Sequence, residues 1–326
     1  MIKQFRSLNP VNIFLLLIIA MVLRSGVFLH LPQTPDLNLR EMMGWMLINM
    51  SEKAILSPLA NVTIAAILTI IQAVILNRII NNHNILGKPT FLPALMYVTI
   101  SSIFLPFIVL NPVIICNFLV VWMISKFLNI YHKDGIGAVM YDLGMIVGAG
   151  TVIYFPFIAM MPLLWISLII FRPFNWREWI ATILGFITVC FFLAVFYYMN
   201  DSFDKFYEIW LPLTNKFPTD FNINLYDYIV LFPVVFIILL AILSLRENFF
   251  RSFVHVRKSF LLLFYMFFLA MISFYLRPHI EIYHFLLGLS PVSILMAYYF
   301  LNAGKAWFYE TVYLLLVGFV IYFQWV

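Results

Sequence analysis

The sequence predicts an all-α fold, a polytopic transmembrane helical bundle of about eleven spans that forms one membrane domain over residues 1–326. Apolar side chains make up 64% of the chain, charged side chains only 10%, and the mean hydropathy is +1.02. Too few polar side chains remain to cover a water-soluble globule of this length. The apolar residues also form long runs with no water-soluble segment between them. Helices suit such runs, because a helix satisfies its own backbone hydrogen bonds in hydrocarbon.

Runs of about 20 apolar residues mark the expected spans, since a helix of that length just crosses the hydrocarbon core. They cover residues 11–30, 58–79, 91–110, 112–128, 136–154, 156–172, 178–199, 226–245, 259–276, 284–301 and 306–325. Two connections are very short, because a proline both ends one helix and suits the first turn of the next at Asn111-Pro112 and Phe155-Pro156. The first run follows basic residues, as a secretory signal does. No small-residue cleavage site follows it and Arg24 interrupts it, so we expect it to remain as the first span.

The distribution of charge predicts the orientation. With the N-terminus inside, thirteen of the 19 Lys and Arg residues fall in cytoplasmic loops and five fall outside. Short basic loops stay on the cytoplasmic side, so we expect the N-terminus inside and the C-terminus outside. The net charge of +5 does not indicate nucleic acid as a partner, because the basic residues lie in short loops between spans. The lipid bilayer is the expected partner.

Two outer loops are long enough to carry a site, and nine of the fourteen acids fall on the outer side. The loop of residues 31–57 contains Asp36 and then a Met- and Trp-rich stretch, Met42 to Met50, which predicts a short helix in the membrane interface. In the loop of residues 200–226, acids and aromatic residues fall on opposite faces of a helix. We therefore expect interfacial helices in both loops.

Arg24 lies about seven residues below the outer end of the first span, roughly 10 Å deep at the rise of an α-helix. A charge at this depth is costly unless it has a partner or reaches the interface. One interpretation is that the side chain extends to the outer headgroups. The other is that it faces a water-filled outer cavity and contacts Asp36 or an anionic substrate.

Asp142 is the deepest acid of the chain, in a span that also carries Gly144 and Gly148. Glycines four residues apart are typical of helices that pack closely in membranes. Asp142 lies on nearly the opposite side of the helix from Gly144, so we expect both faces to touch protein. A structural hydrogen bond from Asp142 to a Tyr or Asn is one interpretation, and a proton-coupling site is the other. Gln72 and Asn117 are expected to form hydrogen bonds between helices.

The last outer loop has the densest group of polar residues, with Arg277, His279 and His284 within eight residues. Arginine binds two phosphate oxygens at once, so this segment indicates a substrate-binding site for phosphate. Ordinary anchoring to lipid headgroups explains the same residues. No phosphate loop, zinc signature or dinucleotide fingerprint occurs. We therefore predict no metal site of the common kinds, the cofactor is unknown, and a divalent metal is not excluded.

Three strings, Gly87–Pro93, Tyr141–Gly148 and Phe171–Trp179, resemble an uncharacterised family of bacterial multi-pass membrane proteins. The string Phe-Arg-Pro-Phe-Asn-Trp-Arg-Glu-Trp is the most specific of them. This resemblance agrees with the predicted topology and implies a bacterial inner membrane as the location. It implies no particular reaction.

Over nearly the whole chain, the order of elements also resembles that of C-type membrane glycosyltransferases. They have an acid after the first span, here Asp36, a glycine-rich middle helix, here Gly144 to Pro156, and a late basic and aromatic outer segment before a Leu-x-Pro helix, here Tyr283 to Pro291. The chain departs from them in lacking a second acidic outer loop and an outer soluble domain.

This second resemblance implies a polyprenyl-phosphate-linked sugar as donor and inverting transfer on the outer side. Asp36 is then the catalytic general base or positions the acceptor, and Arg277 with His279 neutralises the departing lipid phosphate. Arg24 orients Asp36 or binds a phosphate oxygen. Two alternatives are a non-catalytic membrane subunit or scaffold and a transporter or flippase of a lipid-linked substrate. Broken helices at the bilayer midplane would favour the transporter.

Overall fold

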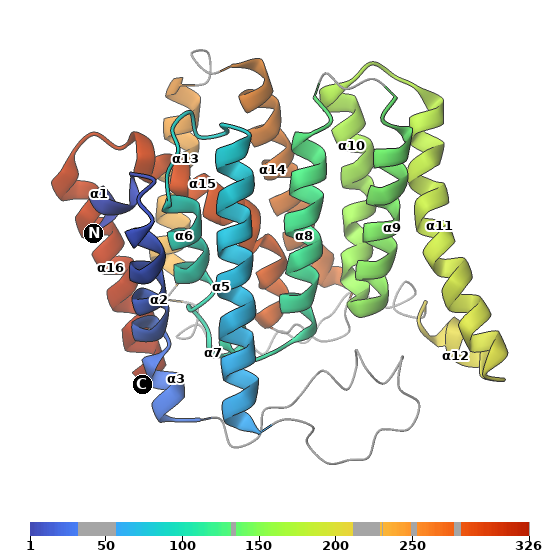
Figure 1. The fold of residues 1–326 in the computed structure, drawn as a ribbon, viewed down its shortest axis with the longest axis horizontal. Helices are drawn as coiled ribbons and strands as arrows, with labels where there is room; N and C mark the ends of the chain where they lie inside the picture. Colours follow the sequence, from blue (N-terminus) through green and yellow to red (C-terminus); the bar gives the residue numbers. More distant parts are fainter. Residues whose placement is uncertain are drawn as a thin grey trace.

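The computed structural model describes residues 1–31, 57–131, 135–210, 229, 231–248, 253–276 and 282–325, and every element in these ranges is helical (Figure 1). The elements are α1 (Ile2–Phe5), α2 (Val11–Leu23), α3 (Ser25–Leu29), α5 (Pro58–Asn82), α6 (Leu92–Ile100), α7 (Leu105–Ile108), α8 (Pro112–Leu128), α9 (Gly137–Ile153), η1 (Phe155–Met160), α10 (Met161–Phe171), α11 (Trp176–Met199), α12 (Phe203–Glu208), α13 (Leu231–Asn248), α14 (Val254–Ile272), η4 (Ser273–Leu276), η5 (Ile282–Gly288), α15 (Leu289–Asn302) and α16 (Ala306–Trp325). The all-α prediction is confirmed over these residues.

Several helices have the length and composition of membrane spans. Among the described residues, five stretches are long and apolar enough to cross a bilayer: Pro58–Asn82, Trp176–Met199, Val254–Leu276, Ile282–Asn302 and Ala306–Trp325. Four apolar helices are shorter: Val11–Leu23, Pro112–Leu128, Gly137–Ile153 and Phe155–Phe171. Large apolar side chains are exposed on the outside of the bundle, for example Phe14 on α2 and Phe191 on α11. These features are those of an integral membrane protein.

Two expected spans are interrupted. The span predicted at residues 91–110 consists of the short helices α6 and α7, with Ser101–Phe104 between them outside any α-helix. Pro106 explains where the second piece begins, because proline has no N–H to continue a helix but fits its first turn, as it does in α7. The span predicted at residues 11–30 is interrupted at Arg24, whose φ of −112° and ψ of 6° separate α2 from α3.

The interfacial helices are described only in part. The loop expected at residues 200–226 begins with α12, a helix of six residues whose Phe203, Phe206 and Tyr207 rings contact one another. The remainder of that loop from residue 211, and the helix expected from Met42 to Met50, lie outside the described residues.

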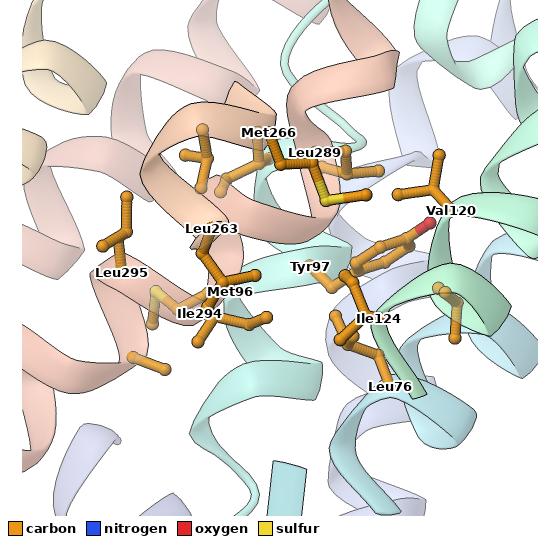
Figure 2. Packing of buried hydrophobic residues seen from close by; sticks show 14 of the residues in the cluster. Leu76, Met96, Tyr97, Val120, Ile124, Leu263, Met266, Leu289, Ile294 and Leu295 are labelled. Carbon is orange, nitrogen blue, oxygen red and sulfur yellow. The ribbon is translucent and has the colours of Figure 1, made fainter. Parts of the chain in front are cut away.

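The centre of the bundle is formed by α6 and α15, which pack against each other. Every residue of α6 is buried, and so is α15 from Leu289 to Phe300. Figure 2 shows side chains of α6 between those of α5, α8, α14 and α15, with Met96, Tyr97, Leu76, Val120, Ile124, Leu263, Met266, Leu289, Ile294 and Leu295 labelled. The interruption after Ile100 therefore lies at the end of a helix that other helices surround.

The remaining helices extend to either side of this centre. In Figure 1, α1, α2 and α16 lie at one end of the long axis, and α9, α10 and α11 lie at the other. The C-terminal end of α16 approaches α3, because a Cβ atom at Gly26 would lie 2.8 Å from the carbonyl oxygen of Gln324. Gln324 also lies at the interruption after α6, where its side-chain amide contacts the backbone of Ser102.

Candidate functional site

Arg24 is the central residue of the candidate site. Its side chain is 1% exposed, so it does not extend to the lipid headgroups. Nε donates a hydrogen bond to Ser102 Oγ at 3.2 Å, and Nη2 donates to Ser101 Oγ at 3.1 Å. Nη1 is buried and has no hydrogen-bond partner among the described residues. A buried cationic group with unused N–H donors favours an additional acceptor, because an unpaired donor costs the free energy of its lost hydration.

The acceptors of Arg24 belong to the interruption after α6. The hydroxyls of Ser101 and Ser102 each donate to the carbonyl oxygen of Val98 at 2.9 Å, so their oxygens are oriented to accept from the guanidinium. Gln324 of α16 donates from Nε2 to the carbonyl oxygen of Ser102 at 2.7 Å. Side chains of two other segments thus provide partners to polar groups where α6 ends.

A chain of buried hydrogen bonds extends from the same face of α6. Tyr97 precedes Ser101 by four residues and therefore lies one helical turn away on that face. Its hydroxyl donates to Gln72 Oε1 at 2.8 Å, and Gln72 Nε2 donates to the carbonyl oxygen of Ile114 at 2.6 Å. The prediction that Gln72 bonds between helices is confirmed, since these contacts link α5 to α6 and α8. The same prediction for Asn117 is wrong, because neither polar atom of its buried side-chain amide has a hydrogen-bond partner among the residues that the structure describes.

The short helix α7 contacts segments that border both candidate loops. Ile108 of α7 forms a buried cluster with Val27 of α3 and Val62 of α5, and Leu31 packs against that cluster. Residue 31 is the last described residue before the loop that carries Asp36. Helix α7 also contacts η5, whose first residue, 282, directly follows residues 277–281. Residue 31, which leads into the loop with Asp36, and residue 282, which follows residues 277–281, therefore both lie close to α7 on one side of the bundle.

Asp36, Arg277 and His279 lie outside the described residues. Their expected meeting with Arg24 stays a prediction.

His284 is a buried residue with partners for both ring nitrogens. It is 2% exposed, and its Nδ1 lies 2.8 Å from the hydroxyl of Tyr154. Nε2 lies 3.1 Å from the carbonyl oxygen of Ala270 and 3.0 Å from Ser273 Oγ. A carbonyl only accepts, so this network fits the tautomer in which Nε2 carries the proton and Nδ1 accepts from Tyr154. The ring can bind a substrate only by exchanging one of these partners.

Asp142 pairs with a lysine and not with the expected Tyr or Asn. Lys126 Nζ lies 2.5 Å from Asp142 Oδ2, and the two side chains are 25% and 46% exposed. The expectation that both faces of this helix touch protein is confirmed, since Asp142 faces α8 and Gly144 faces α11. Asp142 lies in the second turn of α9, where the last turn of α8 provides the cation.

Gly144 and Gly148 lie where α9 packs against α11. A Cβ atom at Gly144 would overlap the carbonyl oxygen of Thr182, and one at Gly148 would lie 2.9 Å from the Cβ of Val189. Gly185 of α11 faces the backbone of Tyr141 in the same way. The backbones of the two helices are in contact here, which only glycine allows.

Sequence reasoning did not identify Ser101, Ser102 and Gln324 as part of the site. The signal that was available is the pair of adjacent serines inside an apolar run, together with one glutamine close to the end of the last span. Among the described residues, no group of three His, Cys, Asp or Glu side chains is arranged to hold a metal ion.

Residues 39–326 match a protein family described as a family of unknown function (DUF6427). No curated protein and no solved structure matches the chain. Because the family match covers most of the chain, this protein belongs to the family of unknown function DUF6427.

Proposed function

We propose that this membrane protein binds the phosphate of a lipid-linked sugar beside Arg24 and transfers the sugar, in the manner of a C-type membrane glycosyltransferase. The observation that carries the proposal is the buried guanidinium of Arg24: within the described part of the chain, its Nη1 has no partner and its other N–H groups donate to neutral hydroxyls. A phosphate oxygen is a suitable acceptor, because hydrogen bonds between guanidinium and phosphate are charge-assisted. Phosphate also supplies the negative charge that offsets the cost of a buried cation.

The position of α7 supports the same proposal. The segments that lead into the loop with Asp36 and out of the loop with Arg277 both border α7. Asp36 follows Leu31 by five residues, and Arg277 directly follows Leu276. In this proposal Asp36 is the general base or positions the acceptor, and Arg277 with His279 neutralises the departing phosphate. His284 acts indirectly by anchoring η5 through Tyr154 and Ser273.

The proposed topology has the N-terminus in the cytoplasm, the C-terminus outside, and all spans in one membrane domain of a bacterial inner membrane. Most Lys and Arg residues fall in the loops on the same side of the membrane as the N-terminus, which supports this orientation. Arg24 and α7 then belong to the outer half of the bundle.

The test is the retention of an isoprenoid phosphate by the full chain purified in a mild detergent. Mass spectrometry of the extracted lipids should detect an isoprenoid phosphate with the native protein and much less with Arg24→Met. Arg78→Met is the matched control, because Arg78 is exposed and no interaction of its side chain occurs among the described residues. Bulk phospholipids alone in the native sample would contradict the proposal.

The transfer step has its own test. Asp36→Asn should abolish incorporation of labelled sugar in membranes that contain the variant, while the isoprenoid phosphate still co-purifies. Full incorporation with Asp36→Asn would remove this residue from the mechanism.

A flippase or transporter of the same lipid-linked substrate is the second candidate. The observation that favours it is the interrupted helix formed by α6 and α7, with non-helical residues next to a buried charge. In reconstituted liposomes, a transporter moves a fluorescent isoprenoid phosphate between leaflets without consuming it. The proposed enzyme instead releases the lipid phosphate from a sugar-bearing donor, so the two products distinguish the candidates.

A further inference from the structure

A hollow of about 440 Å³ lies between the end of α1, the turn that joins α5 to α6, and the end of α15, and Arg24 does not line it. Six residues line it: Arg6, Leu86, Gly87, Lys88, Leu301 and Asn302. We name it the Arg6–Lys88 pocket. Two of its six lining residues are cationic and none is acidic.

The Gly87–Pro93 string builds one wall of this pocket. Thr90 donates from Oγ1 to the carbonyl oxygen of Phe5 at 2.8 Å, and the backbone N–H of Phe91 donates to the same oxygen at 2.9 Å. Asn81 in turn holds Thr90 through two hydrogen bonds to its backbone. These hydrogen bonds hold the backbone of Phe5 against this string. The next residue, Arg6, therefore lines the same pocket as Lys88.

The guanidinium of Arg6 is held in one orientation. Nε and Nη2 donate to the carbonyl oxygen of Phe300 at 2.9 and 2.6 Å, and Nη2 also donates to that of Ala303 at 2.6 Å. The group lies over the ring of Tyr309, with Cζ 4.1 Å from the ring centre. Arg6 thereby caps the end of α15, while Nη1 takes part in none of these contacts. No described carboxylate forms an ion pair with Arg6.

Lys88 adds a second, uncompensated charge. It is exposed, and its ammonium group has no ion pair or hydrogen bond within the described part of the chain. Gly87, just before it, has a φ of +77°, and no atom lies within 4 Å of the position of a Cβ there. The turn therefore leaves open space next to the two cations.

We propose that the Arg6–Lys88 pocket binds a phosphate group. A fixed guanidinium and a nearby ammonium group are the donors that proteins use for phosphate, and each lysine near an anionic surface contributes to such binding. The phosphate has two possible sources, the headgroup of an anionic lipid and a free phosphate. The inference does not depend on the function proposed for Arg24, because no residue is shared.

The test uses the full chain in maltoside micelles, titrated with dihexanoyl phosphatidylglycerol and, separately, with inorganic phosphate. Lys88→Gln should weaken binding of the probe by about fivefold, the share that one lysine near a lipid surface contributes. Lys305→Gln is the matched control, since Lys305 is an exposed lysine three residues after Asn302 that does not line the pocket. This control should change binding by less than about twofold, because salt screens a charge outside the pocket.

The outcomes are separable. Dependence on Lys88 with the lipid probe alone identifies a headgroup site, and the same dependence with inorganic phosphate identifies a free phosphate. Native affinity in Lys88→Gln, or an equal loss in Lys305→Gln, overturns the proposal. Equal melting temperatures of the two variants without probe show that both remain folded. Retention of an isoprenoid phosphate through Arg24 is unaffected by either variant, so failure here does not bear on the proposed function.

Discussion

Arg24 Nη2 donates a hydrogen bond to the Oγ of Ser101 at 3.1 Å, across 77 residues of sequence. Each residue lies where its own helix is interrupted: Arg24 separates α2 from α3, and Ser101 ends α6. Two helix ends inside an apolar bundle leave backbone groups without partners, and polar side chains gather where such groups occur. The buried charge of Arg24 therefore lies where the bundle already has polar groups that can accept its hydrogen bonds.

Replacing Arg24 by Met should raise the melting temperature of protein freed of co-purified lipid phosphate, because a bound ligand would itself stabilise the native protein. The substitution eliminates a buried cation whose Nη1 has no partner among the described residues, and a well-packed apolar replacement of buried charge stabilises by about 1 to 4 kcal/mol. Ser101 and Ser102 keep their bonds to Val98, so no hydroxyl loses its acceptor.

Thermal unfolding in detergent measures this effect, with Arg78→Met as the exposed control. In the lipid-free protein, a lower melting temperature for Arg24→Met would mean that the guanidinium stabilises the fold. That result would weaken the proposal that the guanidinium binds a ligand.

Gly144→Ala should destabilise the protein by about 1 to 3 kcal/mol, because the added methyl group overlaps the carbonyl of Thr182 and pushes α9 from α11. Gly318→Ala is the matched control. No atom lies within 4 Å of its Cβ position in α16, so alanine should leave stability unchanged or raise it by up to about 1 kcal/mol. Melting temperatures of the two variants provide the comparison, and equal values would mean that α9 and α11 are not in backbone contact.

Tyr154→Phe should lower the free energy of unfolding by about 1 to 3 kcal/mol, since Nδ1 of His284 loses the hydroxyl that donates to it. Tyr198→Phe serves as control because Tyr198 is exposed. Denaturant or thermal unfolding measures the difference. If Tyr154→Phe matches its control in stability, the ring of His284 has another donor available and is less firmly held than the distances indicate.

Asp142→Asn should lower stability by about 0.5 to 1 kcal/mol, because Lys126 loses its partner while the pair is only partly buried. The double variant Asp142→Asn with Lys126→Gln should recover most of that loss, since it leaves no unpaired charge. With the single variant Lys126→Gln and the native protein, the four melting temperatures form a double-mutant cycle. Additive losses would show that the two side chains are not coupled.

Much of the fold follows from the sequence alone. Helix α8 occupies the residues predicted for its span, 112–128, because Asn111 and Pro112 mark its start unambiguously. Apolar runs of the right length likewise located α5, α9, α11 and α16 to within a few residues. Composition determines these elements, since hydrocarbon admits few alternatives to a helix.

The interior of the bundle was decided by tertiary structure. Hydropathy does not reveal that residues 91–110 form two short helices, because the serines at the interruption are too few to change the average of the run. Nor does hydropathy reveal which residue accepts a hydrogen bond from Arg24, because this depends on α6 lying beside α2. Apolar periodicity predicts that a helix is buried, whereas hydrogen bonds between helices depend on which neighbours meet in space. For this protein, the sequence by itself determined the membrane-embedded helical class, and only the packing decided where its polar groups found partners.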